Sequence, residues 1–346
     1  MNKKPGNGSI KRAVLIAIIV LLAIILAVLV VGTAFVTATL NKIERVDPAE
    51  TLSQEEIESI LNEEIEETTP DFTGEVINSE DLELPEEPVE VVETGDEVIQ
   101  ILLVGQDTKS MSSRSRTDSM ILCTVNLTDK TLTMTSFMRD MYLKLPGYQS
   151  QRLNVAYLLG GFDALYNALE YNFGVQADYG VAVNFASFQK VIDAVGGVDV
   201  ELTSREATHL NLNYYGFNLT EGLNHLNGEA ALAYSRIRKL DSDFNRTNRQ
   251  RTVMMALLEK AKTLPATELY DLVETLIPMV VTDMTNSEII DVAFDIVPIL
   301  GELQVISQRI PIDGEYRNAW VDGMAVLLPD LEANRQYLVD TIGNKE

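Results

Sequence analysis

The feature that most constrains this chain is a run of 28 residues, Ala13 to Leu40, that contains no charged side chain. The first 19 of these residues are all aliphatic. At about 1.5 Å per residue, a helix of that length nearly crosses a hydrocarbon core of roughly 30 Å, and Gly32 to Leu40 leave length for tilt. We expect a transmembrane anchor rather than a cleaved signal peptide, because signal peptides have apolar cores of only about 7–15 residues.

The charges on either side of this run predict its orientation. Four Lys or Arg residues precede it, and two, Lys42 and Arg45, follow it. The excess of positive charge before the run places the N-terminus in the cytoplasm. We therefore expect a single-pass protein of the cell membrane, in which residues 1–12 form a cytoplasmic arm, 13–40 form the anchor, and the rest of the chain is extracellular.

Acidic residues are concentrated in one segment of the chain. The net charge is −25, and residues 46–98 hold twenty Asp or Glu residues, no Lys or Arg, and Phe72 as their one aromatic side chain. Such a composition buries too little apolar surface to order itself. We expect residues 41–96 to be a largely disordered acidic linker, either a spacer above an anionic surface or a solvated linker without a partner. The acidic balance excludes a general nucleic-acid binder, which needs a basic face.

From residue 97 onwards the hydrophobic pattern alternates between strand and helix periodicity. Strands are predicted at 97–105, 119–127, 131–138, 179–185 and 304–312, and helices at 162–172, 188–195 and 286–299. This order predicts an α/β domain over residues 97–346, with a mixed central sheet sandwiched by helices. A single cysteine, Cys123, excludes an intramolecular disulfide and a CxxC metal site. The chain has no GxGxxG or Walker loop to support nucleotide binding.

Arginines are grouped in a few short segments, and one group lies at the start of a predicted helix. Arg246, Arg249 and Gln250 share a helix face with Val253 and Leu257. Because the apolar end of this stripe must face the core, the arginines face inward as well, and an unpaired buried charge is costly. We therefore favour an anionic partner, such as phosphate, over a solvated basic helix.

Arg251 lies off that stripe, and we expect it on the surface.

Two aspartates lie at the ends of neighbouring predicted strands. Asp107 ends the first strand and Asp118 opens the second. Carboxylate oxygens at adjacent strand ends suit Mg²⁺, which commonly binds one or two carboxylates together with substrate phosphate. The alternative is that both aspartates are simple turn formers.

Seven stretches of this sequence, taken in order, resemble the LytR-CpsA-Psr (LCP) family of cell-wall glycopolymer ligases. They are ILLVGQD (101–107), RTDSMIL (116–122), TSFMRDMYLKLPG (135–147), RLNVAYLLGG (152–161), VIDAVGGVDVEL (191–202), LNGEAALAYSRIR (226–238) and DFNRTNRQR (243–251). The resemblance implies an LCP-like fold and the transfer of an anionic glycopolymer, such as teichoic acid or capsule, from an undecaprenyl-pyrophosphate carrier to peptidoglycan. It also implies an apolar pocket for the polyprenyl tail, with candidate side chains in the Leu158–Leu169 and Phe185–Val195 stripes.

The same resemblance assigns roles to particular residues. It implies that Asp107 and Asp118 hold Mg²⁺ and that both, with Arg139, act in catalysis. The residues that it implies for pyrophosphate binding are Arg116, Arg139, Arg236, Arg238, Arg246 and Gln250. Two departures from the family pattern are Lys109, where arginine is common, and Met138, where proline is usual. Two other functions remain open. A non-catalytic polyprenyl-phosphate-binding scaffold or regulator of envelope assembly would need the arginines but could dispense with Asp107 and Asp118. A pyrophosphatase acting on the same lipids would use the same residues with water as the acceptor.

Overall fold

A seven-stranded sheet forms the centre of the computed structural model, which describes residues 40–45, 55, 74–106, 114–238, 240–241, 243–262 and 280–344. In spatial order the strands are β1 (Glu44–Arg45), β11 (Val280–Thr282), β8 (Tyr179–Asn184), β3 (Val98–Gln106), β4 (Thr117–Asn126), β5 (Thr131–Phe137) and β12 (Gln304–Ile310). β3 pairs antiparallel with β4 and parallel with β8, and β12 pairs parallel with β5. The predicted mixed central sheet is confirmed.

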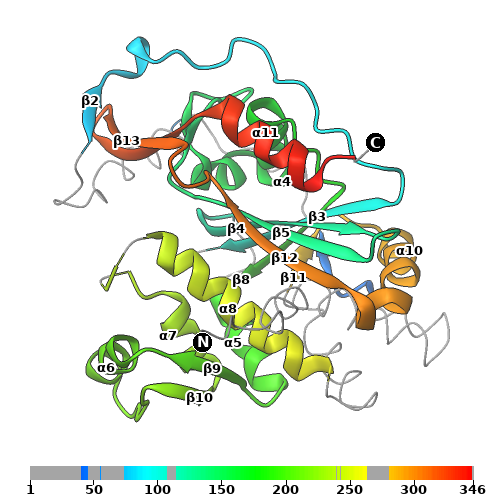
Figure 1. Cartoon of the computed structure of the whole chain (residues 1–346), viewed down its shortest axis with the longest axis vertical. Coiled ribbons are helices and arrows are strands. Elements are labelled where there is room, and N and C mark those ends of the chain that lie inside the picture. Colours follow the sequence, from blue (N-terminus) through cyan, green and yellow to red (C-terminus); the bar gives the residue numbers. More distant parts are fainter. Residues whose placement is uncertain are drawn as a thin grey trace, which may run out of the picture.

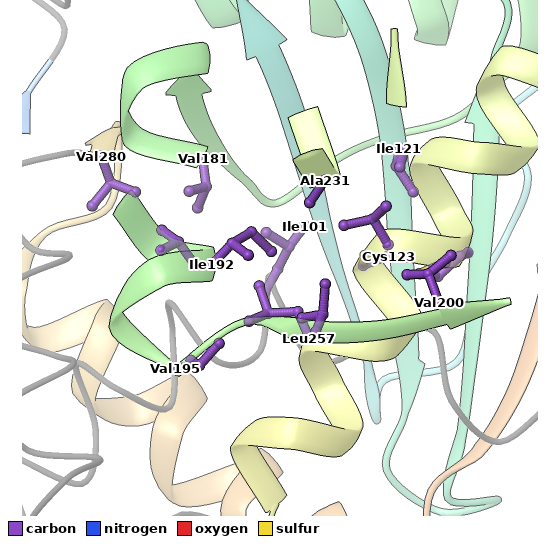
Figure 2. Close-up of a cluster of buried hydrophobic side chains, with 14 of the residues drawn as sticks. Ile101, Ile121, Cys123, Val181, Ile192, Val195, Val200, Ala231, Leu257 and Val280 are labelled. Carbon is purple, nitrogen blue, oxygen red and sulfur yellow. The ribbon is translucent and has the colours of Figure 1, made fainter. Parts of the chain in front are cut away.

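Helices cover both faces of this sheet (Figure 1). On one face lie α4 (Ala156–Phe173) and α11 (Leu331–Ile342). On the other lie α5 (Phe185–Ala194), α7 (Gly228–Ser235) and α8 (Asp243–Lys262). Successive strand side chains point to opposite faces, so Ile101 belongs to the core beneath α5 and α8, whereas Leu102 belongs to the core beneath α4. Figure 2 shows the first of these cores, where β3, β4 and β8 meet α5, α7 and α8.

Smaller elements extend the domain at its two ends. Near α8 lie α6 (Ser204–Asn213) and the antiparallel pair β9 (Val198–Leu202) and β10 (Gly222–Leu226). At the opposite end, β13 (Tyr316–Val321) pairs with β14 (Met324–Pro329) and with β2 (Glu75–Ile77). The remaining elements are β6 (Tyr142–Leu143), β7 (Gln151–Arg152), α10 (Asn286–Ile296) and the 3-10 helices η2 (Ser79–Asp81), η3 (Leu153–Val155) and η5 (Val297–Glu302).

Residues 74–96 correct the prediction of a largely disordered linker over 41–96. β2 pairs parallel with β13, and Val92 is 5% exposed and donates its backbone N–H to Gly174 O at 2.8 Å. Strand pairing, individual backbone hydrogen bonds to the domain, and the packing of Ile77, Leu82 and Leu84 on the core beside β13 and β14 attach this stretch. Residues 46–54 and 56–73 lie outside the described residues.

The predicted anchor, 13–40, also lies outside the described residues, apart from Leu40. Within the described ranges, no helix combines the length and apolarity needed to cross a bilayer.

Candidate functional site

Asp118 is the centre of a cluster of arginines that come from three parts of the chain. Its side chain is 9% exposed. Asp118 Oδ1 accepts hydrogen bonds from Arg139 Nη1 at 2.6 Å and from Arg238 Nη2 at 2.9 Å. Arg246 Nη1 lies 3.6 Å from the same oxygen. The structure thus brings together residues that are more than a hundred positions apart in the sequence.

The 3-10 turn η3 ties together the strand ends that carry Asp118 and Arg139. Thr117, the neighbour of Asp118 on β4, donates its hydroxyl to Asn154 O at 3.3 Å. Asn154 in turn donates its backbone N–H to Arg139 O at 3.1 Å. These two hydrogen bonds, one from a side chain and one from the main chain, help to fix the separation of Asp118 and Arg139.

Charges within the cluster keep Asp118 ionised. Burial raises the pKa of the Asp118 carboxyl, but Arg139, Arg246 and Arg238 outweigh this effect and hold the pKa below its ordinary value of 3.8. Burial lowers the pKa of Arg246, with a partial offset from Asp243, whose Oδ2 accepts a hydrogen bond from Arg246 Nη2 at 2.9 Å. The cluster is therefore made of charged groups held in a low-dielectric environment.

Several buried polar atoms in the cluster have no hydrogen-bond partner among the described residues. They are Arg139 Nε, Arg246 Nε, Arg246 Nη1 and Gln250 Oε1. A buried polar atom left without a partner costs about 1–3 kcal/mol, and more when it is charged. Arg246 and Gln250 are four residues apart on α8 and therefore share one face. Arg139 Nε and Arg246 Nη1 have carboxylate oxygens only at ion-pair distances, of 3.4 Å to Asp140 and 3.6 Å to Asp118. An anion with several oxygens would supply hydrogen-bond acceptors to these donors.

An apolar cavity lies beside these groups, between the sheet and helices α5, α7 and α8. Its apolar lining comes from Leu103, Ile121, Val181, Val183, Phe185, Phe188, Leu232 and Met254. Its polar lining includes Asp118, Arg236, Arg238, Arg246 and Gln250. The Arg236 guanidinium stacks over the Phe185 ring at 4.3 Å from its centroid. The cavity is thus suited to a ligand with a charged group and an apolar chain.

A sequence model of the LytR_cpsA_psr family matches residues 68–339. The chain belongs to this family. The regulatory protein MsrR of Staphylococcus aureus is 32% identical over 246 residues, which are 70% of this chain and 73% of MsrR. The polyisoprenyl-teichoic acid–peptidoglycan teichoic acid transferase TagU of Bacillus mycoides is 32% identical over 222 residues, 63% of this chain and 70% of TagU. A solved structure of TagT bound to LIIa-WTA is 25% identical, with a TM-score of 0.60, covering 78% of this chain and all of that one.

The structure places most of the residues that the LCP resemblance implies in one region. Asp118, Arg139, Arg236, Arg238, Arg246 and Gln250 belong to the arginine cluster or line the cavity. Arg116 lies two residues before Asp118, just ahead of β4, and does not line the described cavity. Asp107 lies outside the described residues. Within the described ranges, no group of three or more His, Cys, Asp or Glu side chains is arranged to hold a metal ion.

Of the two stripes expected to line a lipid pocket, the structure supports one. Phe185 and Phe188 of α5 line the cavity. The Leu158–Leu169 stripe belongs to α4, which packs on the opposite face of the sheet. Periodicity identifies a buried face of each helix but not which face of the sheet it covers. Leu232 and Met254 also line the cavity but were not among the predicted residues, although each lies four residues from a polar residue of the site, Arg236 and Gln250 respectively.

The predicted surface position of Arg251 is wrong. Arg251 is 8% exposed and donates from Nη1 to Ser136 Oγ at 2.9 Å. Burial, with Arg309 nearby, lowers its pKa to about 10. A single apolar stripe predicts one buried face for α8, but the side of α8 that carries Arg251 also packs against the end of β5.

The family departure at Met138 has a local explanation. Its backbone N–H donates to Ile310 O at 2.8 Å, a bond between β5 and β12 that proline could not make. This hydrogen bond, rather than a proline ring, therefore fixes the backbone just before Arg139.

Arg249 faces inward as predicted, but its partners belong to the protein. It donates from Nε to Glu206 Oε1 at 2.7 Å and from Nη1 to Asp241 Oδ1 at 3.0 Å and to Ile237 O at 3.2 Å. Burial raises the pKa of Glu206, but hydrogen bonds from Thr203 and Arg249 outweigh it and lower the pKa overall. Arg249 therefore holds α6 and the connection that carries Arg238.

We expect Arg249→Ala to lower the free energy of unfolding by about 3 kcal/mol, because it leaves Glu206 buried without its cation. Urea unfolding of the two proteins measures the difference. Arg317→Ala is the matched control, since Arg317 pairs with Glu75 at the surface and such pairs contribute about 0–1 kcal/mol. An Arg249→Ala effect as small as the control would show that the pair does not stabilise the fold.

Proposed function

We propose that this LCP protein is a phosphotransferase that moves an anionic glycopolymer from an undecaprenyl-pyrophosphate carrier to peptidoglycan. The observation that carries the proposal is a set of buried arginine donors that have ion-pair neighbours but no hydrogen-bond partner among the described residues, beside an apolar cavity. A polyprenyl pyrophosphate has the same two parts, an anion rich in oxygens and an apolar tail. TagU is a teichoic acid transferase by name, and TagT has been solved with LIIa-WTA bound, which supports the same substrate class here.

In this reaction the protein mainly has to stabilise negative charge in the transition state, and it forms no covalent bond to the substrate. The acceptor hydroxyl of peptidoglycan attacks the phosphorus that carries the glycan, and the bond from that phosphorus to the bridging oxygen breaks. Polyprenyl phosphate leaves with the electron pair of that bond. Negative charge grows on the bridging and equatorial oxygens, where Arg139, Arg238 and Arg246 are held by the fold to stabilise it.

The charges around Asp118 limit which group can accept the hydroxyl proton. Because three arginines lower the pKa of Asp118, its carboxylate is a weak proton acceptor. Burial, with a contribution from Asp140, raises the pKa of Asp243 despite the neighbouring Arg246 and Arg139. Asp243 is therefore the better base of the two, and Asp118 serves as the counter-ion that orients the arginines.

We propose that Asp118 and Asp107 would hold Mg²⁺, since carboxylate oxygens suit this ion; Asp107 itself lies outside the described residues. The pKa of Asp118 is below its ordinary value, so the carboxylate is ionised, and its Oδ2 accepts a hydrogen bond from Arg238 Nη2 at 3.0 Å. Asp107 directly follows Gln106, which pairs with Thr117, the neighbour of Asp118. A bound Mg²⁺ would neutralise charge on the phosphate oxygens.

The proposed activity requires the domain to meet a lipid carrier at a membrane. In our proposal the uncharged run 13–40 is a single N-terminal anchor, and its flanking cations favour an orientation with residues 41–346 outside the cell. Peptidoglycan and the lipid-linked glycan are then both on the side of the membrane that holds the cavity.

The test uses the full-length protein in detergent with Mg²⁺, a synthetic lipid-pyrophosphate glycan and peptidoglycan fragments, followed by mass spectrometry. The expected product is peptidoglycan that carries the glycan through a phosphodiester. MsrR, a relative named as a regulatory protein, favours a second candidate, a non-catalytic scaffold or regulator that binds polyprenyl phosphates. Tight lipid binding without any product would support this candidate, and release of glycan phosphate into water would support a pyrophosphatase.

We also predict that the apolar cavity binds the lipid tail of the substrate. Val183→Trp on β8 fills part of the apolar lining, and we expect KM for a long-chain substrate to rise at least about tenfold, since each buried CH₂ contributes about 0.8 kcal/mol. KM for a short, water-soluble pyrophosphate analogue should not change. Leu212→Trp, at a side chain that is 81% exposed, is the control. An equal rise for both substrates would show that the cavity does not hold the tail.

A further inference from the structure

The residues that directly follow the predicted membrane span are part of the folded domain. β1 pairs parallel with β11, with Glu44 opposite Val281 and Arg45 opposite Thr282. Leu40 is 1% exposed and Ile43 is 5% exposed, and both belong to the core on the cavity side of the sheet. The chain therefore enters the domain at the last residue of the uncharged run.

Polar contacts fix the same residues against α10 and the end of β11. Asn286 Nδ2 donates to Asn41 Oδ1 at 2.9 Å. Arg45 donates from Nε to Met284 O at 3.1 Å and from Nη2 to Asn286 Oδ1. Main-chain pairing, apolar burial and side-chain hydrogen bonds thus act on a stretch of only six residues.

The register of the sheet places this attachment close to the cavity. Arg45 pairs with Thr282, Thr282 with Val181, and Val181 with Leu103, so the four residues form one row across the sheet. Val181 and Leu103 line the cavity. Neighbouring strands are about 4.8 Å apart, so the backbone of Arg45 lies roughly 10 Å from that of Val181.

We propose that the docked segment 40–45 holds the domain directly against the bilayer, with the β1 edge of the sheet towards the lipid and the cavity two strands away. The proposal rests on the membrane anchor of the proposed function. A free 41–96 linker of 56 residues would have a root-mean-square reach of about 40 Å. A docked β1 removes that reach, keeps the cavity at a fixed height, and raises the effective concentration of membrane-embedded substrate. The acidic residues 46–73 then join two attached strands, β1 and β2, and do not set the distance to the membrane.

Two insertions of the same length distinguish a docked domain from a tethered one. A 30-residue Gly/Ser segment is placed in the full chain either between Ala38 and Thr39 or between Glu63 and Glu64. Transfer is measured with lipid-linked substrate in vesicles and with the same substrate in detergent. We expect the first insertion to lower turnover in vesicles at least about tenfold and to leave turnover in detergent unchanged. We expect the second insertion to stay within about twofold of the unmodified protein in both assays.

One other outcome would overturn the docked strand, and a different one would refute the proposed function. Equal effects of the two insertions in vesicles would overturn the docked strand, because a free linker tolerates extra length at either position. No transfer by the unmodified protein in either assay would refute the proposed function itself.

A cross-link tests the attachment without any activity. In the full chain in vesicles, the pair Asn41→Cys and Asn286→Cys should form a disulfide on mild oxidation, because these side chains are in contact. The control pair, Asn41→Cys with Asn318→Cys on β13, should not form one, and the native Cys123 is buried. Equal cross-linking of the two pairs would show that residues 40–45 are not docked.

Discussion

Arg246→Ala will lower transfer of the glycopolymer at least about a hundredfold, the loss that follows when one donor to a developing oxyanion is removed. The side chain of Arg246 is 2% exposed, and its Nε and Nη1 have no hydrogen-bond partner among the described residues. These donors are available to phosphate oxygens without first breaking a hydrogen bond within the protein. Turnover of a lipid-pyrophosphate glycan with peptidoglycan fragments, followed by mass spectrometry, measures the loss.

Arg246→Lys separates charge from shape at this position. Lysine keeps the positive charge but cannot present two parallel donors, so we expect it to recover only part of the activity. Arg317→Ala is the matched control and should leave transfer unchanged, because Arg317 lies on β13, away from the cavity. Thermal unfolding of each variant reports whether the fold survives. Full activity of a folded Arg246→Ala protein would remove Arg246 from the reaction.

At this site, the direction of a side chain could be predicted from the sequence where the spacing of residues along one helix determines it. Arg246 and Gln250 are four residues apart on a helix that also carries Val253, so their common inward direction follows from helix periodicity. The burial of Arg251 could not be predicted in this way. Its environment depends on Ser136, which comes from β5 and is distant in sequence. A periodic pattern states which side chains share a face, but not how many faces of the helix are covered.

The role of Arg249 illustrates a second limit of the sequence. Its inward position was predicted, and the expected anionic partner exists, but this partner is Glu206 on α6 together with Asp241. A buried arginine requires an anion whether that anion is a ligand or a side chain. Only the tertiary contacts distinguish Arg249, which donates hydrogen bonds to two carboxylates, from Arg246, whose Nε and Nη1 have no hydrogen-bond partner among the described residues.

The strands of the central sheet were predictable, whereas the short strand β2 of the separate three-stranded sheet was not. The strands that form β3, β4, β5 and β8 are rich in β-branched and aliphatic residues and were found within one or two residues of their ends. β2 has only three residues and lies within the acidic segment 46–98. Its pairing with β13 is a contact across more than 200 positions, which local composition does not encode.

The second large effect is expected at Asp118, where substitution should reduce both transfer and stability. Asp118→Asn keeps the size of the side chain but removes the charge that Arg139, Arg238 and Arg246 surround. We expect transfer to fall at least about a hundredfold, because the arginines lose the counter-ion that orients them. The free energy of unfolding should fall by about 3 kcal/mol, mostly through the well-buried Arg139 and Arg246, since Arg238 is 45% exposed and solvent screens its contribution.

The pH dependence of stability identifies the Asp118 contribution. The folded pKa of Asp118 is below its ordinary value of 3.8, so the carboxylate stabilises the fold fully above that pH. The contribution is lost as pH falls through the folded pKa, where Asp118 becomes protonated. Urea unfolding between pH 3 and 7 should therefore show a smaller acid-side loss of stability in Asp118→Asn than in the unmodified protein. Parallel curves for the two proteins would contradict the ion-pair account.

Chelation separates the counter-ion role of Asp118 from a role as metal holder. If Asp118 and Asp107 also hold Mg²⁺, EDTA should abolish transfer by the unmodified protein, and added Mg²⁺ should restore it. EDTA should leave the unfolding curve at neutral pH unchanged, because the arginines, and not a metal, balance the charge of Asp118 in the free protein. Undiminished transfer in EDTA would remove the metal from the reaction and leave Asp118 as the counter-ion of the arginine cluster alone.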